Sequence, residues 1–369
     1  MCPTSPERSP GSTADASLSI LIAGLVSVRL TGVRLLRGDT GYWVRTVLGP
    51  LASAAHGEAD VTIRFAPDVR PRGPELGSLP VGIAGRDEVW VADPRGRPAV
   101  LPLADLGSRP VTVDTEIDPW AFESWVFMPL VRAALWKHGA SLIHAAGAVV
   151  DGRAVALAGW TGSGKTRVVM ELLARGADLL GDDWLALTPE GLVAPVQGHV
   201  DLTLDSRRRE GFRGAPRLAR RAGMAVTRWG TARLGRLPRV SKGLARLGDP
   251  PVVVAPVGRV FPGSRVAGPS PLDTLVLLVP PGVPTPPPAA SAEVIGIQNQ
   301  MYLREGPAIE SAFRLAFPGR LEVSMFPAAD EECRMLAKSL STARLLVARL
   351  APTSAGIDAV LRTVEGALR

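Results

Sequence analysis

A glycine-rich loop occupies residues 159–166 and matches the pattern G-x-x-x-x-G-K-[ST] at every fixed position. Glycines in such a loop let backbone N–H groups turn inward around phosphate oxygens, and the following helix adds the positive end of its dipole. The pattern places Lys165 on the β and γ phosphates of a nucleotide and the Thr166 hydroxyl on Mg²⁺. It therefore predicts that ATP and Mg²⁺ are the cofactors and that the loop residues bind them: Gly159, Trp160, Thr161, Gly162, Ser163, Gly164, Lys165 and Thr166.

Two adjacent carboxylates follow this loop. Asp182 and Asp183 come after a short apolar segment and Gly181, sixteen residues beyond Thr166. Carboxylates at the end of such a strand meet Mg²⁺ or its water shell in nucleotide-binding proteins. One carboxylate on the metal and one as general base suits phosphoryl transfer to a hydroxyl better than hydrolysis. The alternative for this pair is a solvated turn.

A predicted hairpin places a histidine beside the loop. The Asp-Gly pair at 151–152 supplies the positive φ angles of a type I′ turn between two strand-like segments, 141–150 and 153–158. Without a bulge, this turn sets His144 opposite Gly159. We therefore expect His144 to contact a phosphate or to tune the catalytic carboxylate. The alternative is a hydrogen-bonded histidine at the end of a sheet.

The stretch from His144 to Asp183 resembles the HPr kinase/phosphorylase family. In that family a histidine opens the hairpin, the phosphate loop follows, and an Arg-Gly pair, here Arg175-Gly176, leads to the two aspartates. The resemblance covers about 50 of the 369 residues. It implies an ATP-dependent, serine-directed kinase with an α/β P-loop core related to phosphoenolpyruvate carboxykinase.

The resemblance also implies roles for the site residues. Lys165 would bind phosphate, and Thr166 and Asp183 would hold Mg²⁺. Asp182 would be the general base, with Asp183 and His144 as supporting catalytic groups.

Two features depart from the family pattern. Arg167 stands directly after the loop threonine, where the family often has glutamate. The Arg-Gly-x-Gly signature that follows the aspartates in the bifunctional enzymes has no visible counterpart. We therefore expect no reverse, phosphorylase reaction.

The remaining chain predicts a tail and a separate N-terminal region. We expect disorder over residues 1–17, a β-rich and antiparallel region over 18–119, and the P-loop domain over 120–369. That domain opens with an apolar helix, 120–137, broken at Pro129.

Further elements are expected around and after the phosphate loop. They are a helix over 166–175 ended by Gly176, strands over 178–180 and 184–187, a strand pair over 252–254 and 272–279, and a strand over 345–350. A terminal helix follows, and its apolar face consists of Ile357, Val360, Leu361, Val364 and Leu368.

Composition excludes several classes of protein. Hydrophobic residues make up 46% and charged residues 21%, as in a globular chain, and the apolar run 18–28 is too short for a membrane span. Cys2 and Cys333 cannot form a disulfide framework or a four-cysteine zinc site, and four histidines leave little scope for a histidine-rich centre. We expect a reduced, cytoplasmic protein without a targeting segment.

Positive charge is concentrated in one segment. The net charge is +7, but residues 206–250 hold thirteen basic side chains against Glu210 and Asp249. We therefore expect a basic insertion at 206–250, either a solvated one or one that steers an acidic substrate. Only Phe212 and Trp229 interleave the arginines, which is sparse for base stacking, so nucleic acid is not an expected partner.

The leading functional hypothesis is a kinase for Ser or Thr hydroxyls of a protein or peptide. A ribosomally made natural-product peptide is one candidate substrate, and a homo-oligomer is compatible with the sequence. The alternatives are a small-molecule kinase on the same scaffold and a nucleotide-gated regulatory binding module. Two carboxylates favour the kinases, because a switch needs only one carboxylate on the Mg²⁺ side.

Overall fold

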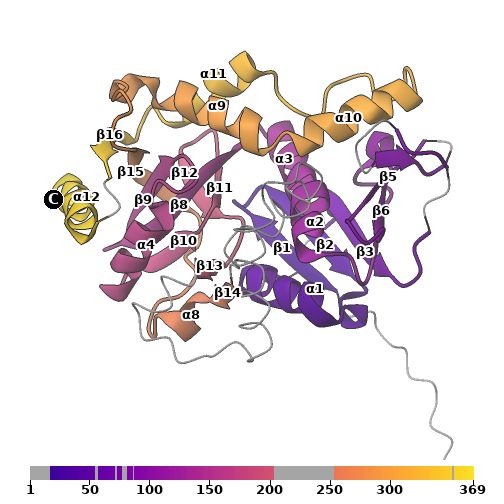
Figure 1. Ribbon diagram of the computed structural model, residues 1–369, viewed down its shortest axis with the longest axis horizontal. Helices are drawn as coiled ribbons and strands as arrows, with labels where there is room; N and C mark the ends of the chain where they lie inside the picture. Colours follow the sequence, from indigo (N-terminus) through magenta and orange to yellow (C-terminus); the bar gives the residue numbers. More distant parts are fainter. Residues whose placement is uncertain are drawn as a thin grey trace, which may run out of the picture.

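The computed structural model describes residues 17–54, 57–70, 73–76, 81–85, 87–202, 253–350 and 353–369. Residues 1–16 of the expected tail and the whole expected insertion, 206–250, lie outside the described residues. The chain has a mixed α/β fold with two seven-stranded sheets (Figure 1). Within the described residues, no helix is long and apolar enough to cross a membrane.

The first sheet belongs to the N-terminal region and has the order β1-β2-β3-β7-β6-β5-β4. Its strands are β1 (Leu18–Ile22), β2 (Val26–Thr31), β3 (Val61–Ala66), β4 (Val81–Ile83), β5 (Val89–Ala92), β6 (Pro98–Leu101) and β7 (Val111–Asp114). The prediction of an antiparallel region is wrong for its centre, because β3 pairs parallel with both β2 and β7. Parallel neighbours need a long crossover, and segments 32–60 and 67–110 supply it. Alternation along a strand reveals its two faces but not the direction of its neighbours.

The apolar helix at the centre of the chain is broken, as predicted, but not at Pro129. It consists of α2 (Pro119–Phe122), a π-helical turn η5 (Glu123–Phe127) and α3 (Met128–Lys137). Pro129 lies in the first turn of α3, where a missing N–H is tolerated. The Asp118 carboxylate caps α2 by accepting from the N–H groups of Trp120 and Ala121. This cap fixes where the helix begins.

The second sheet contains the predicted hairpin. Its strands are β8 (Ser141–Val150), β9 (Arg153–Gly159), β10 (Asp178–Gly181), β11 (Trp184–Leu187), β12 (Leu192–Pro195), β15 (Ser270–Val279) and β16 (Arg344–Arg349). Asp151 and Gly152 both have positive φ, at 49° and 80°. Gly147 pairs with Ala156 in the unbulged register that the turn predicts.

The strand pair expected at 252–254 and 272–279 is wrong. The first segment becomes β14 (Val253–Pro256), which pairs with β13 (His199–Leu202) in a sheet of their own. The second segment, β15, instead lies parallel to both β9 and β16. Its unbroken apolar run is typical of a parallel strand covered on both faces, which an antiparallel hairpin partner does not require.

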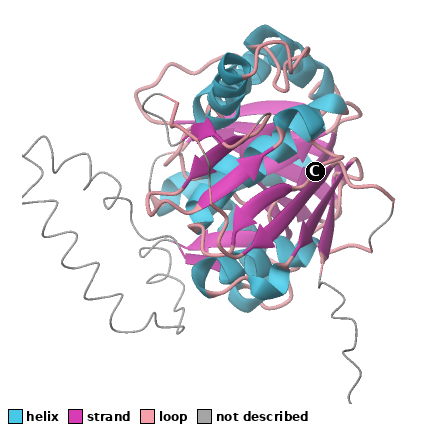
Figure 2. Cartoon of the chain, turned by 90° about the vertical axis from the view of Figure 1, so that its right-hand side faces the viewer, coloured by secondary structure: helices cyan, strands magenta, loops and turns pink. Residues whose placement is uncertain are grey.

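Helices cover both faces of the second sheet (Figure 2). One face packs against α4 (Lys165–Ala174) and α12 (Ser354–Leu368), and the other packs against α9 (Ser291–Tyr302) and α11 (Ala329–Ser339). Successive side chains of strand β9 point to opposite faces of the sheet. Val155 and Leu157 therefore pack in the core with α4 and α12, and the alternating alanines pack in the core with α9 and α11.

The first sheet and the second share a core. Helix α3 packs on β2 and β3 and also on β8, so that Val131 and Leu142 belong to one apolar cluster. The domain boundary expected at residue 119 stays a prediction. The apolar cluster contains residues from both sides of this position. Helix α10 (Glu305–Ala316) extends from the side of the second sheet to β4 and β5 (Figure 1).

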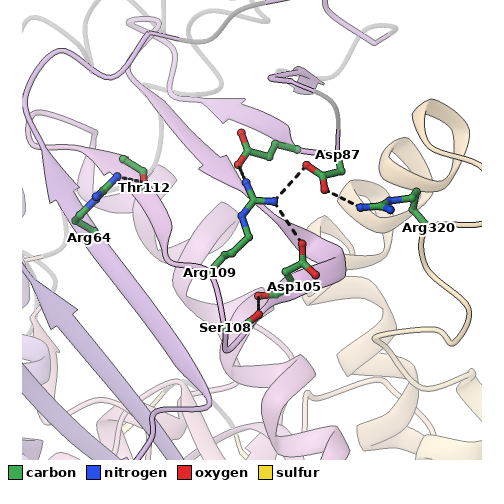
Figure 3. A network of polar contacts seen from close by, with 8 residues as sticks. Arg64, Asp87, Asp105, Ser108, Arg109, Thr112 and Arg320 are labelled. Carbon is green, nitrogen blue, oxygen red and sulfur yellow. Dashed lines mark hydrogen bonds and ion pairs between the residues drawn. The ribbon is translucent and has the colours of Figure 1, made fainter.

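A polar network fastens the loop after α10 to the first sheet (Figure 3). Arg109 contacts Glu88, Asp87 and Asp105, and Asp87 also accepts from Arg320 at 2.7 Å. Hydrogen bonding from Arg109 holds the pKa of Asp87 below its usual range. Exposed pairs of this kind stabilise a fold by about 0–1 kcal/mol each. The network therefore orients the loop more than it stabilises the molecule.

Candidate functional site

The phosphate loop joins β9 to α4, as predicted. Gly159, Gly162 and Gly164 adopt positive φ angles of 154°, 81° and 90°. A Cβ on Gly164 would lie 2.4 Å from a methyl carbon of Leu350, which would have to move aside, and the φ of 90° strains any residue other than glycine at this position. Helix α4 begins at Lys165, one residue before the predicted start.

Lys165 is folded back onto its own loop. Its Nζ donates to the carbonyl oxygens of Gly159 at 2.8 Å and Trp160 at 3.4 Å, and the residue is only 5% exposed. Burial lowers the pKa of Lys165, while the charges of Asp183 and Asp182 oppose that change. A phosphate would give this desolvated ammonium a stronger, charged partner than the two carbonyls.

The two aspartates face different partners. Asp182 is buried and its Oδ1 accepts from the Thr166 hydroxyl at 2.7 Å. Asp183 has a φ of 91°, which is unusual for a residue with a Cβ and stores strain of about 1–3 kcal/mol. The Asp183 carboxylate lies 2.8 Å from His144 Nε2. The adjacent carboxylates therefore hydrogen-bond to different residues, although the charges of both act on Lys165.

Asp183 remains ionised more readily than an ordinary aspartate. Burial alone would raise its pKa, but the hydrogen bond from His144 and the charges of His144, Lys165 and His199 together lower it. The side chain is 48% exposed, whereas His144 is 4% exposed. Asp183 therefore combines a fixed orientation with access to solvent, as a proton acceptor needs.

Tyr302 is a site residue that the sequence analysis missed. It ends α9, and its hydroxyl oxygen accepts from the Thr161 N–H of the phosphate loop at 3.1 Å. Its ring centroid lies 4.3 Å from that of His144. One side chain thus contacts both the loop and the histidine. Nothing in the sequence around Tyr302 marks it, apart from the rarity of tyrosine, which occurs twice in the chain.

A buried polar network holds the end of α9 in place. Glu332 of α11 is fully buried and accepts from Arg132, Ser141, Asn299 and Gln300 at 2.8–3.1 Å. Arg132 also donates to the carbonyl oxygen after Tyr302, at 3.2 Å. Removing one partner of such a buried pair costs about 3–5 kcal/mol. The network therefore fixes the position from which Tyr302 reaches the loop.

A cavity of about 620 Å³ opens beside Thr161, His144 and Asp183. The opposite wall comes from the N-terminal half and from the start of α10. Its polar and aromatic members are Asp39, Tyr42, Trp43, Asp118, Trp120, Glu123, Ser124 and Glu305. Asp183 lines this cavity and Asp182 does not. Of the predicted site residues, His144, Thr161 and Asp183 line the cavity, and the N-terminal half adds a second wall opposite them.

The donor set at Thr166 suits Mg²⁺. A hydroxyl oxygen and a carboxylate oxygen 2.7 Å apart are hard ligands of the kind that Mg²⁺ takes alongside phosphates and waters. Across the described residues, no group of three His, Cys, Asp or Glu side chains is arranged to hold a metal ion.

No family model matches the chain, and no curated protein matches it. Among solved structures, the chain is similar to the Hpr(Ser) kinase/phosphatase from Coxiella burnetii, with 17% sequence identity and a TM-score of 0.24. That similarity covers 40% of this chain and 71% of the other. The functional conclusion therefore depends on the site itself.

Proposed function

We propose that this chain is an ATP- and Mg²⁺-dependent kinase that transfers the γ-phosphate to a Ser or Thr hydroxyl of a protein or peptide. The observation that carries the proposal is that two adjacent aspartates beside one phosphate loop have different contacts. Asp182 accepts a hydrogen bond from the Thr166 hydroxyl, which would ligate Mg²⁺, whereas Asp183 is hydrogen-bonded to His144 and lines the cavity. A nucleotide-gated binding module needs the first carboxylate but has no use for the second.

Each residue has a distinct task in this reaction. The loop N–H groups and Lys165 bind and orient the phosphates, and Thr166 with Asp182 would hold Mg²⁺, which neutralises charge on the phosphate oxygens. Asp183 accepts the proton of the acceptor hydroxyl. The hydroxyl oxygen then forms its bond to the γ-phosphorus as the bond to the bridging oxygen of ADP breaks. His144 keeps the Asp183 carboxylate oriented and ionised.

This assignment exchanges the roles that the family resemblance implied. The resemblance made Asp182 the base and put Asp183 on the metal. The hydrogen bonds favour the reverse, because the Asp182 Oδ1 atom accepts from the Thr166 hydroxyl, which would ligate Mg²⁺, while Asp183 contacts the buried His144 of β8. Mutation of each aspartate distinguishes the two assignments.

A small-molecule kinase is the second candidate. The cavity volume of about 620 Å³ lies within the range that small ligands occupy in proteins. It would equally take one or two side chains of a peptide. Both candidates use the same phosphoryl-transfer groups, so they differ only in the acceptor.

Loss of the loop lysine tests the proposal. We expect Lys165→Ala to lower phosphoryl transfer from ATP by at least about 100-fold, because phosphate clamps commonly contribute that much or more. Lys137→Ala is the matched control, since Lys137 is exposed at the end of α3 and far from the loop in sequence. Transfer measured with labelled ATP should be unchanged in the control. Activity of Lys165→Ala within tenfold of the parent chain would refute the phosphate-loop assignment.

A further inference from the structure

Aromatic residues are concentrated at the cavity beside Asp183. Of the twenty described residues that line it, five, a quarter of them, are tryptophan or tyrosine, whereas all aromatic residues together make up 5% of the sequence. Both tyrosines of the chain and three of its eight tryptophans line this cavity: Tyr42, Trp43, Trp120, Trp184 and Tyr302. General composition does not account for this concentration.

Three of the five rings have partners within the fold. The ring centroids of Trp184 and Tyr302 lie 5.1 Å and 4.3 Å from that of His144. Trp43 is 5% exposed and packs edge-to-face on Phe122, with the ring centroids 5.6 Å apart. These three rings therefore orient the histidine or belong to the apolar core.

The other two rings are exposed at the cavity. Trp120 is 59% exposed and makes no ring contact with any residue that the structure describes. Tyr42 is 42% exposed, and its hydroxyl donates to the carbonyl oxygen of Val254 at 3.0 Å, which orients the ring. Folding usually covers most of the surface of such large side chains. Packing of the described residues therefore does not explain these two rings.

Local structure presents both rings to the cavity. Helix α2 buries Ala121 and Phe122 and leaves Trp120 on its exposed side, where Trp120 lines the cavity. Helix α1 (Gly38–Trp43) leaves Tyr42 exposed in the same way. The two helices pack against each other. Neighbouring helices thus place two uncovered rings on one wall.

Other apolar side chains extend this surface. Pro119, Met128, Pro129 and Leu303 line the same cavity, and methionine adapts its shape to a bound group. Asp183, the proposed proton acceptor, lines it as well. A volume of about 620 Å³ has room for one or two side chains beside the accepting hydroxyl. Aromatic walls bind flat apolar groups through buried area and through offset or edge-to-face stacking.

We propose that Trp120 and Tyr42 bind an apolar side chain, above all an aromatic one, that neighbours the accepting Ser or Thr of the substrate. This inference rests on the proposed function and names the class of peptide. Tryptophan and tyrosine serve as anchors at binding surfaces because they offer a large, rigid contact area at a small cost in side-chain entropy.

Uncharged peptides test the preference. Ser peptides of equal length carry asparagine on both sides of the serine, and phenylalanine replaces one asparagine at a time. We expect phenylalanine at one of these positions to lower KM about tenfold, and leucine at that position to lower it less. Because the peptides do not differ in charge, the ratio of KM values should not change with salt. Equal KM values for all the peptides would overturn the inference while leaving the kinase intact.

Variants of Trp120 locate the effect. We expect the ratio of KM for the asparagine peptide to KM for the best phenylalanine peptide to fall from about ten to about one in Trp120→Ala, and to persist in Trp120→Phe. The fold should tolerate both changes, because the helix cap uses only the backbone N–H of Trp120. Leu315→Ala removes a 77% exposed apolar side chain that does not line the cavity and is the matched control, with the ratio unchanged. A ratio that persists in Trp120→Ala would overturn the inference, as would a weakened affinity for ATP, which would assign the ring to adenine.

Binding without turnover separates this inference from the proposed function. The Lys165→Ala variant, whose phosphoryl transfer is expected to be lost, is titrated with the asparagine and phenylalanine peptides by calorimetry. Tighter binding of the phenylalanine peptide, lost when Trp120→Ala is added, supports the aromatic site even if the parent chain transfers no phosphate, in which case only the proposed function fails. Equal binding of the two peptides would overturn the aromatic site even if transfer occurs.

Discussion

The two walls of the cavity differ in how the chain builds them. The phosphate wall comes from one stretch of forty residues, 144–183, in which a hairpin, a loop, a helix and a turn follow one another. The opposite wall gathers residues from Asp39 to Glu305, on helices that pack against a different sheet. The phosphate wall contributes Thr161 of the loop together with His144 and Asp183, and the opposite wall contributes further carboxylates and aromatic rings. Donor binding is therefore local in sequence, whereas acceptor selection depends on tertiary structure.

The largest expected effect comes from removing the proposed general base, Asp183, from the phosphate wall. Asp183→Asn should lower kcat by about 100- to 10,000-fold, which is the usual contribution of a general base, with the Kd for ATP unchanged. Asp182→Asn should instead weaken the affinity for Mg²⁺, because Asp182 contacts the Thr166 hydroxyl. The variant should therefore need a higher Mg²⁺ concentration for half-maximal transfer. Steady-state kinetics across a Mg²⁺ series compare the two variants. If Asp182→Asn abolishes transfer at saturating Mg²⁺ and Asp183→Asn does not, the roles are those of the family resemblance.

A second effect concerns pH. Asp183 works as a base only when it is ionised, so kcat/KM must fall as pH drops through its pKa. Because His144 and Lys165 lower that pKa, the acid limb should lie below the ordinary aspartate range. His144→Ala removes the hydrogen bond, so the pKa of Asp183 should rise and the acid limb should move to higher pH. A limb that stays in place in the variant would show that His144 does not tune Asp183.

A smaller effect compares the two tyrosines: Tyr302, which contacts the loop of the phosphate wall, and Tyr42, which belongs to the opposite wall. Tyr302→Phe loses the oxygen that accepts from the Thr161 N–H and should weaken ATP binding by about threefold to tenfold, as for one hydrogen bond. Tyr42→Phe loses a contact to the carbonyl oxygen of Val254 on the other wall and should leave the Kd for ATP unchanged. Titration calorimetry measures both. Equal losses in the two variants would contradict the separation of donor and acceptor walls.

The phosphate wall could be predicted because its signals are short-range. The Asp-Gly turn fixes the register that brings His144 beside the loop, and the glycines of the loop have φ angles that other residues rarely adopt. The different contacts of Asp182 and Asp183 could not be predicted from the sequence. They depend on the backbone dihedral of Asp183, which residue type alone does not indicate.

The opposite wall and parts of the fold could not be predicted for a related reason. Parallel pairing of β3, and of β15 with β9, joins segments far apart in the chain, and alternation carries no information about direction. Tyr302 reaches the loop only because the buried Glu332 network fixes the end of α9. Such a network leaves no periodic pattern in the sequence.

The fate of the γ-phosphate distinguishes a kinase from a nucleotide-gated binding module. The full chain is incubated with γ-labelled ATP, Mg²⁺ and a Ser-containing peptide, and labelled peptide, free phosphate and ADP are quantified together. We expect the label to accumulate on the peptide serine with one ADP formed per phosphopeptide, and we expect Asp183→Asn to abolish this transfer. Release of the label as free phosphate alone, at the same rate with and without peptide, would contradict a kinase and indicate a nucleotide-gated binding module.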